Sequence, residues 1–374
     1  MTPPPTGSRV RARLLLAVGA AVAVGVLAFW TEGEPVPARP YDPPPRASLE
    51  RTHLHLQPGK PLTAGVNTLW CATMSMAWDA LAAAAGGGPL EVGPPANGDD
   101  FAALAAHPLP AGTVAPDRGV VRGGRGPGVV TAFAADVRTR LGDVFALPDF
   151  PVGPDDLVAL AALRVELPFA VDFAVDPRPG RFAGGEPRIT TFRVPADLST
   201  EATGRMRAHV QFYGDAPRPD ASFAVALETT AAGERVLLAR IPRPATRDAG
   251  GAARPGLRTR PAAPLGMGDL RWVPCVHAGV ERLWSAWAGA PVRGAKGDVG
   301  PLRVLGQRVD LTLDEWGARV ESSAESLAMP GGRRFEFADP FLLALAREGA
   351  ARPYLLAWFE NDDLFRKVGA EAPR

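Results

Sequence analysis

The sequence predicts an α+β protein whose strands form mainly antiparallel sheets. Several short segments alternate apolar and polar residues, which is the pattern of a half-buried strand. One longer segment, residues 69–85, has apolar residues at three- and four-residue spacing and predicts a helix that ends at a run of glycines. Two apolar runs near the C-terminus, residues 341–343 and 354–359, lie either side of a polar break and predict a buried hairpin. Strands of this kind with few helices are typical of the α+β class.

The N-terminal segment predicts a membrane anchor. Residues 1–13 are polar and include three arginines, whereas residues 14–30 contain no charged residue. As a helix the uncharged run would be about 25 Å long, slightly shorter than the ~30 Å hydrocarbon core of a bilayer. The basic side is expected in the cytoplasm. We expect an uncleaved transmembrane anchor; the alternative, a cleaved signal peptide, would also export the rest of the chain.

The remaining chain is predicted to be one exported domain on a tether. Residues 31–47 are rich in proline, which favours an extended and stiff conformation. Residues 48–366 follow as a single domain and residues 367–374 as a tail. The protein would then be a single-pass protein of the cell membrane in a bacterial envelope, with its C-terminal domain outside the cytoplasm. The net charge is +1 with both signs intermixed, so no nucleic-acid partner is expected.

Within the domain, further strands are predicted from short apolar runs. The helix at residues 69–85 carries tryptophan, methionine and leucine on one face, which we interpret as its core-facing side. The predicted strands are residues 163–175, 205–213, 222–228 and 235–241, the last two forming a hairpin, and residues 269–287 are expected to be a strand followed by a short helix.

The segment from residue 309 onward carries the most specific pattern. Residues 309–313 alternate apolar and polar and predict a strand that ends at Asp314, Glu315 and Gly317. Residues 318–334 have no sustained apolar period and contain Pro330-Gly331-Gly332, so they are expected to form an exposed loop.

This order of motifs resembles the C-terminal third of the serpins. The acidic-x-Gly hinge of that family corresponds to Glu315, Gly317 and Ala318. The motif that follows the family's reactive-centre loop corresponds, with one residue fewer, to Phe337, Ala338, Asp339, Pro340 and Phe341. A weaker similarity to an early family motif begins at Asn67.

The resemblance implies a serpin-like fold and a protease-inhibitor type of function. It implies a large mixed or antiparallel central sheet with additional sheets and surrounding helices. It also implies a reactive-centre loop that a protease cuts near Leu327, Ala328 or Met329, after which the hinge side inserts into the central sheet as a new strand. The implied partner is a protease or another envelope protein.

The loop itself predicts a divergent member of this family. From Ala318 onward the small residues share one parity and the charged residues Arg319, Glu321 and Glu325 share the other, so the charges could all face solvent after insertion. The loop is several residues shorter than the family's inhibitory pattern, and Met329 precedes a proline. We therefore expect an impaired or absent inhibitory trap, and a binding module rather than an enzyme.

The two cysteines support other hypotheses. Cys71 and Cys275 could form a disulfide in an exported protein, or each could be a small buried hydrophobic residue. Cys71 at the start of a helix could also be an activated nucleophile, as in papain-like thiol proteases, with His209 or His277 as the base. The glutamine and the His-plus-Asn motif of that family are absent. A structural envelope protein of unrelated α+β fold is the third hypothesis.

No cofactor or metal ion is predicted. His53 and His55 would point to the same side of a strand, but no third ligand lies near them in the sequence. The glycine-rich stretch at residues 123–128 lacks the Lys-Ser/Thr pair of a phosphate-binding loop and is expected to be a flexible connector.

Overall fold

The computed structural model describes the folded part of the chain. The described residues are 45–57, 62–93, 104, 108–142, 151–195, 198–214, 222–243, 270–285, 289–302, 305–318 and 335–369. The chain divides into a unit Met1–Pro40 and a unit Tyr41–Arg374, and every described residue belongs to the second. The expected anchor and the expected reactive-loop residues Leu327, Ala328 and Met329 lie outside these ranges. No helix within the described ranges has the length and apolar content needed to cross a membrane.

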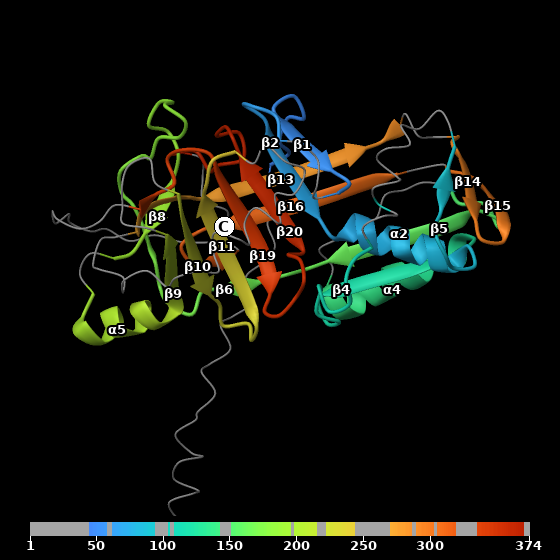
Figure 1. Cartoon of the computed structure of the whole chain (residues 1–374), viewed down its shortest axis with the longest axis horizontal. Coiled ribbons are helices and arrows are strands. Elements are labelled where there is room, and N and C mark those ends of the chain that lie inside the picture. Colours follow the sequence, from blue (N-terminus) through green and yellow to red (C-terminus); the bar gives the residue numbers. More distant parts are fainter. Residues whose placement is uncertain are drawn as a thin grey trace, which may run out of the picture. The chain divides into compact units, whose positions relative to one another are not determined.

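A seven-stranded mixed sheet forms the centre of the fold (Figure 1). Its outer pair, β1 and β2, is parallel, and every other neighbouring pair is antiparallel. Both predicted hairpins, β10–β11 and β19–β20, are confirmed. In spatial order the strands are β1 (Thr52–His55), β2 (Asn67–Cys71), β20 (Leu355–Phe359), β19 (Phe341–Arg347), β11 (Glu234–Arg240), β10 (Phe223–Glu228) and β9 (Val210–Gly214).

A four-stranded sheet packs against one end of the large sheet through phenylalanines. The ring of Phe335 lies 4.3 Å from that of Phe212 and 5.0 Å from that of Phe223, measured between centroids. These contacts join the two sheets in one hydrophobic core. The strands, in spatial order, are β18 (Phe335–Glu336), β12 (Leu270–Pro274), β8 (Thr191–Arg193) and β7 (Ala174–Val175).

The expected helix after residue 274 is instead a strand. Strand β13 (Val276–Leu283) pairs antiparallel with β16 (Gly306–Leu313) along its whole length. Val276, Ala278 and Val280 are buried at a spacing of two residues, which is the period of a strand. The predicted strand at residues 309–313 is confirmed as part of β16, but it lies in this two-stranded sheet and not inside the large one.

Two helix boundaries also differ from the prediction. Helix α2 (Thr73–Ala84) begins later than expected because residues 69–71 belong to β2, whose five residues are all buried beside β20. Residues 205–209 are helical and not extended, as the end of α5 (Thr200–His209). The hydroxyl of Ser199 accepts a hydrogen bond from the amide of Ala202 (3.1 Å) and caps α5.

The glycine-rich stretch is part of a folded β-α-β unit and not a connector. Strand β4 (Gly119–Arg125) pairs antiparallel with β5 (Leu157–Leu163), and α4 (Pro127–Leu141) connects them. A Cβ at Gly123 would lie 2.5 Å from the carbonyl oxygen of Ala80, so glycine lets β4 approach the backbone of α2. Three short strands complete the described part as a further sheet: β3 (Glu91–Val92), β14 (Pro291–Gly294) and β15 (Gly297–Pro301).

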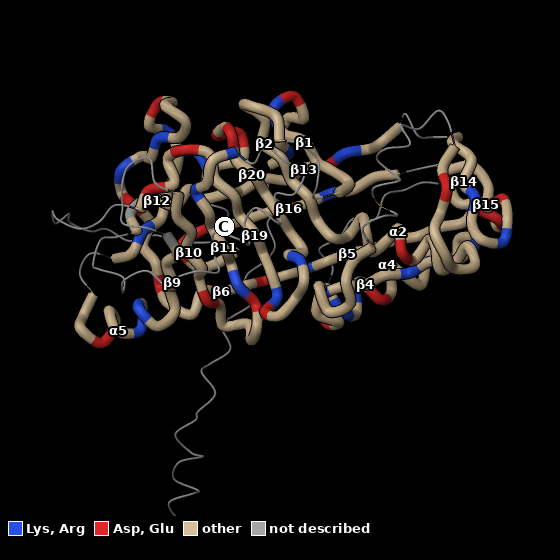
Figure 2. Tube along the Cα trace, in the orientation of Figure 1, with Lys and Arg blue, Asp and Glu red and all other residues tan. Residues whose placement is uncertain are grey.

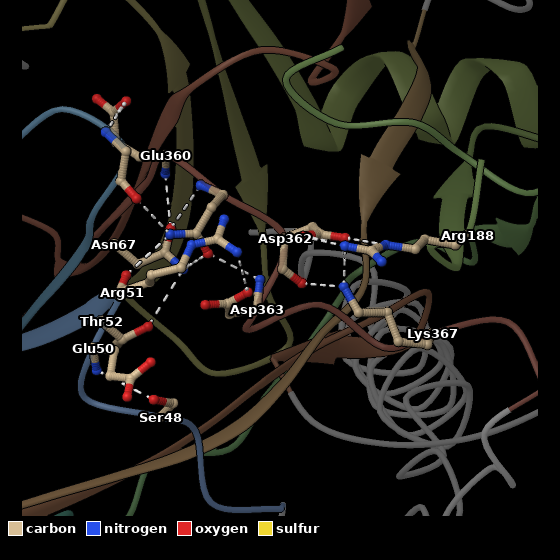
Figure 3. Close-up of polar contacts among 12 residues, drawn as sticks. Ser48, Glu50, Arg51, Thr52, Asn67, Arg188, Glu360, Asp362, Asp363 and Lys367 are labelled. Atoms are coloured by element: carbon tan, nitrogen blue, oxygen red, sulfur yellow. Dashed lines mark hydrogen bonds and ion pairs between the residues drawn. The ribbon is translucent and has the colours of Figure 1, made fainter. Parts of the chain in front are cut away.

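Buried polar contacts tie the C-terminal segment to the first strands (Figure 3). The side chain of Asn67, which is fully buried, accepts hydrogen bonds from the amides of Glu360 (2.8 Å) and Asn361 (3.0 Å). It also donates to the side-chain oxygen of Asn361 (2.7 Å). Burial raises the pKa of Asp362, but its bonds to Arg188 and Lys367 outweigh this and lower that pKa to about 2.

The ordered domain extends beyond both of its predicted boundaries. The amide of Ala47 donates to the carbonyl of Gly279, and the amide of Gly279 donates to that of Pro45 (2.9 Å), so residues that were expected in the tether pair with β13. At the other end, the amide of Val368 donates to the carbonyl of Arg188 (2.9 Å). Acidic and basic residues are intermixed over the described part, as the composition predicted (Figure 2).

Candidate functional site

The chain reverses direction at the end of β16. The amide of Asp314 donates to the carbonyl of Gly317 (2.9 Å), and the amide of Gly317 donates back (3.3 Å). The carboxylate of Asp314 accepts from the amide of Trp316 (3.0 Å), a local bond that aspartate makes in turns. The predicted hinge residues therefore lie together in a tight turn, and the strand does not lead straight into an exposed loop.

The two residues after this turn form a short strand, β17 (Gly317–Ala318). It pairs antiparallel with β6 (Leu167–Pro168), and the amide of Phe169 donates to the carbonyl of Trp316 (2.9 Å). Ala318 is 7% exposed and belongs to this strand, whereas residues 319–334 of the expected loop lie outside the described residues.

The position of β17 relative to β16 follows from backbone direction. In an extended strand, successive residues point their N–H and C=O groups alternately to the two edges. The amide of Trp284 donates to the carbonyl of Leu305 (2.8 Å). In the same register, the backbone N–H and C=O groups of the odd-numbered residues of β16 point to β13. Asp314 is even-numbered and bonds to Gly317. Strand β17 therefore lies on the edge of β16 that is opposite to β13.

The same reasoning places β17 relative to β5. The amide of Arg164 donates to the carbonyl of Arg118 (2.9 Å). The backbone N–H and C=O groups of the even-numbered residues at the end of β5 therefore point to β4. The amide of Phe169, an odd-numbered residue of the same extended segment, bonds to Trp316 next to β17. Strand β17 therefore lies between β16 and the continuation of β5, and runs antiparallel to both.

The geometry of β17 defines what we name the insertion site: the edge of β16 opposite to β13 and the edge of β5 opposite to β4. Among the described strands, only β17 pairs at this edge of β16, and no strand pairs with this edge of β5. On β16 the inward-facing residues Val309, Leu311 and Leu313 are buried, whereas Arg308 and Asp310 between them face outward as an ion pair (3.0 Å). A strand that continues β17 beside β16 would thus have apolar neighbours on its inward side and charged neighbours on its outward side.

Gly317 is required for this arrangement. Its φ is +146°, and a Cβ there would lie 2.3 Å from the carbonyl oxygen of Leu167. We expect Gly317→Ala to lower the free energy of unfolding by about 1–3 kcal/mol, because the alanine is strained and pushes β17 from β6. Urea unfolding measures the loss, and faster hydrogen exchange of the Phe169 amide locates it. Gly204→Ala in α5, where a Cβ has no neighbour within 4 Å, is the matched control and should not destabilise the protein. Equal effects of the two substitutions would contradict the assignment.

Glu315, in the turn, is buried beside the C-terminal segment. Its carboxylate lies 3.8 Å from the guanidinium of Arg366, and it is 2% exposed. Arg366 also donates from its backbone amide to the carbonyl of Cys275 (2.9 Å). The hinge turn is thereby attached to the segment that follows β20.

The predicted motif from Phe337 to Phe341 has a packing role. Phe337 and Phe341 are both fully buried, and their ring centroids lie 5.1 Å apart. The amide of Phe337 donates to Trp272 of β12 (2.8 Å), the carbonyl of Ala338 accepts from Ala183 (2.8 Å), and Asp339 pairs with Arg240. Pro340 immediately precedes β19. The motif connects the four-stranded sheet to the large sheet.

The structure does not support the hypotheses based on cysteine. Both Cys71 and Cys275 are free and buried, so the possible disulfide is not formed. Burial raises the pKa of the Cys71 thiol, and Cys71 is the last residue of β2 and not the start of a helix. A buried thiol whose pKa is raised is poorly suited to act as a nucleophile. The described residues also contain no group of three or more side chains arranged to hold a metal ion.

Comparison with known proteins gives distant structural similarity only. No protein-family model and no curated protein matches the sequence. The structure is similar to human thyroxine-binding globulin in complex with thyroxine, with a TM-score of 0.39 and 11% identity over 63% of this chain and 64% of that one. It is also similar to native protease nexin-1 with heparin, with a TM-score of 0.37 and 14% identity over 63% and 65% of the two chains. A thermophilic serpin, tengpin, in its native state gives a TM-score of 0.44 and 10% identity over 79% and 88%.

Tengpin is a serpin, but all three TM-scores are below 0.5, so these similarities assign neither a fold nor a family to this chain. The chain spans slightly less than two thirds of the length of thyroxine-binding globulin and of protease nexin-1. At this level of similarity a functional conclusion has to come from the strand pairing in the chain itself.

Proposed function

We propose that this protein is a serpin-like binding module that responds to proteolytic cleavage, and that it is not an enzyme. A cut beyond Ala318 would release the hinge side of the loop, which would then extend β17 along the insertion site. The observation that carries this proposal is the position of β17, which already occupies the first two places of such a strand between β16 and β6.

The register of β17 supports an insertion of this length. Continuing the pairing of Asp314 with Gly317 places residue 325 opposite Gly306, the first residue of β16. Continuing the pairing of Ala318 with Leu167 places residue 328 opposite Leu157, the first residue of β5. A cut after Ala328 therefore leaves enough residues on the hinge side to fill both edges, and a cut after Leu327 leaves one residue fewer on the β5 side. The shortness of the loop matches the shortness of its acceptor strands.

The sequence beyond β17 also suits the two faces of the site. In this register Val320 lies opposite the buried Leu311 and Ser322 opposite the buried Val309. On the outer face, Arg319 would lie between Glu166 and Thr312, next to an opposite charge. Glu321 would lie between Arg164 and Asp310, one opposite and one like charge. Arg164 and Glu166 are only half-buried, so an ion pair with either would add little to the free energy of insertion. Its main effect would be on the register and orientation of the strand.

We further propose that cleavage does not trap the protease. In a trap, insertion has to be fast and strongly favourable while the protease is still joined to the loop as an acyl-enzyme. Here the first residue pairs of the inserted strand exist before any cut, so part of the free energy of insertion is already released. With residues 14–30 as an anchor and the proline-rich residues from 31 to the start of the described domain as a tether, the module would meet its proteases outside the cytoplasmic membrane.

Limited proteolysis tests this function. Chymotrypsin- and trypsin-type proteases are added at the lowest ratio that gives one cut within residues 319–334, located by mass spectrometry. We expect two fragments that stay associated in gel filtration and no protease–fragment complex on a denaturing gel. Hydrogen exchange should slow at the amides of the even-numbered residues of β16, which point to the edge opposite to β13. Unchanged exchange in β16 would reject the insertion. A covalent complex that survives denaturation would show that the protein is a trapping inhibitor.

A further inference from the structure

The outer edge of β1 borders a hollow that is separate from the insertion site. It has a volume of about 360 Å³ and is lined by residues of β1 and of the end of β13, with Leu49 and Trp284 beside them. This volume lies within the range, about 300–1,000 Å³, that is usual for small-molecule sites. Strand β1 is the last strand of the large sheet, so one of its edges has no strand partner within the described residues.

Arg282 closes part of that edge and is itself fixed in position. The amide of Asn67 donates to the carbonyl of Arg51 (2.8 Å), so odd-numbered residues of β1 face β2 and the carbonyl of Leu54 points to the outer edge. Nη1 of Arg282 donates to this carbonyl (3.2 Å), and its guanidinium lies over the ring of Trp284, 5.3 Å from the centroid. A guanidinium has five N–H donors and this bond uses one, so positive charge and donors are held at the wall of the hollow.

Two histidines extend this donor surface. His53 and His55 share one face of β1, with ring centroids 6.1 Å apart and ring planes at 27°. Burial and, secondly, the charge of Arg282 lower the pKa of His53. The charge of Arg282 thus disfavours a second positive charge on His53, and a negatively charged ligand beside both would offset that repulsion. None of the lining residues is acidic.

Apart from Thr52, the other side chains that line the hollow are apolar. Leu54 and Leu56 are buried beneath the hollow, Trp284 is 7% exposed, and Leu49 is 43% exposed at its rim. An apolar wall beside fixed cationic donors distinguishes this site from a patch of surface arginines, because it can shield one side of a ligand from water.

We propose that this hollow binds a small organic anion, with a carboxylate, sulfate or phosphate head group joined to an apolar or aromatic body. Arg282 holds the head group, and the imidazole N–H groups of His53 and His55 assist it. The body lies against Trp284 and Leu49. This binding does not depend on the loop or on its cleavage.

Calorimetry with three probes tests the proposal on the intact protein. Naphthalenesulfonate carries both parts of the ligand, inorganic sulfate carries the head group alone, and naphthalenemethanol carries the body without charge. We expect naphthalenesulfonate to bind at least about tenfold more tightly than either of the other probes, because one charge-assisted hydrogen bond contributes about 1.5–3 kcal/mol. The imidazole NMR signals of His53 and His55 should shift on binding, and that of His209 should not.

Variants locate the site and control for folding. Arg282→Gln should weaken naphthalenesulfonate binding about tenfold or more. The double variant His53→Gln with His55→Gln should also weaken naphthalenesulfonate binding. It keeps the bond from Arg282 to the carbonyl of Leu54, so it still tests the site if Arg282→Gln impairs folding. Arg293→Gln, in an exposed ion pair with Asp298 (2.8 Å), is the matched control and should bind as the wild type does. Equal binding of the sulfonate and the alcohol, or full binding by both site variants, would overturn the proposal.

Discussion

Adding a peptide with the sequence of residues 319–328 to the intact protein is expected to raise its melting temperature by about 4 °C. The peptide, RVESSAESLA, supplies the strand that would continue β17. At a concentration of about 100 times its Kd, a ligand that binds only the folded state stabilises it by about 2.7 kcal/mol. At an unfolding entropy of about 2.1 cal/mol/K per residue, a change of 1 kcal/mol moves the melting temperature of a domain of about 320 residues by about 1.5 °C. Differential scanning fluorimetry at several peptide concentrations measures the shift.

The physical reason is that the peptide finds two strand edges and one apolar face already arranged for it. Its backbone would pair with β16 on one side and β5 on the other, and β17 fixes the register at one end. Each hydrogen bond contributes only about 0.5–1.5 kcal/mol net, and ordering each residue costs about 1–2 kcal/mol. A strand paired on both edges makes about twice as many of these bonds as a strand paired on one edge, for the same ordering cost.

Two control peptides separate insertion from nonspecific binding. Exchanging Arg319 and Glu321 keeps the composition but places like charges opposite Glu166 and Arg164, and this peptide should stabilise less. Replacing Val320 and Ala324 by aspartate puts charges on the inward face, beside the buried Leu311, and should abolish the effect. If all three peptides raise the melting temperature equally, the peptide does not bind at the insertion site in the register that β17 predicts.

The sequence could predict the strands whose own residues define them. The hairpin β19–β20 follows from two apolar runs at a short spacing, and β16 follows from strict alternation between buried and outward-facing residues. Each pattern is local, because burial of one face of a strand selects every second residue. The family resemblance added a site to these elements by marking Glu315 and Gly317 as a hinge.

The sequence could not predict features that depend on a distant neighbour. Strand β17 contains two residues and exists because Leu167 and Pro168 lie beside it. The glycines near residue 123 predict a loop from sequence alone, and only the packing of α2 against Gly123 explains why they lie in a strand. The hollow at β1 needs Arg282, which is far from His53 in the sequence and reaches it only because β13 passes that edge. Such contacts are set by topology and leave no local pattern.

Replacing Asn67 by alanine is expected to lower the free energy of unfolding by about 3–5 kcal/mol. The side chain of Asn67 is fully buried and bonds to both amides at the end of β20, and to the side chain of Asn361 (Figure 3). Alanine would leave the two amide donors without this partner, and the side-chain oxygen of Asn361 would keep only its bond from the amide of Asp363 (3.0 Å). Each unsatisfied buried group costs about 1–3 kcal/mol, so the losses add up to a large fraction of a typical domain's stability. Urea unfolding followed by tryptophan fluorescence measures the change.

A matched amide separates this effect from the general loss of a polar side chain. Gln211 on β9 also makes two side-chain bonds, to Glu228 (3.2 Å) and Tyr213 (2.7 Å), but it is only half-buried, so water can replace it in Gln211→Ala at a cost of about 1 kcal/mol or less. In the double variant Asn67→Ala with Asn361→Ala, the cost should be less than the sum of the two single costs, because the bond between the two side chains is lost only once. Additive costs would mean that the two side chains act independently. The contact between them would then not be what holds the C-terminal segment, and through Arg366 the hinge turn, against the first strands of the sheet.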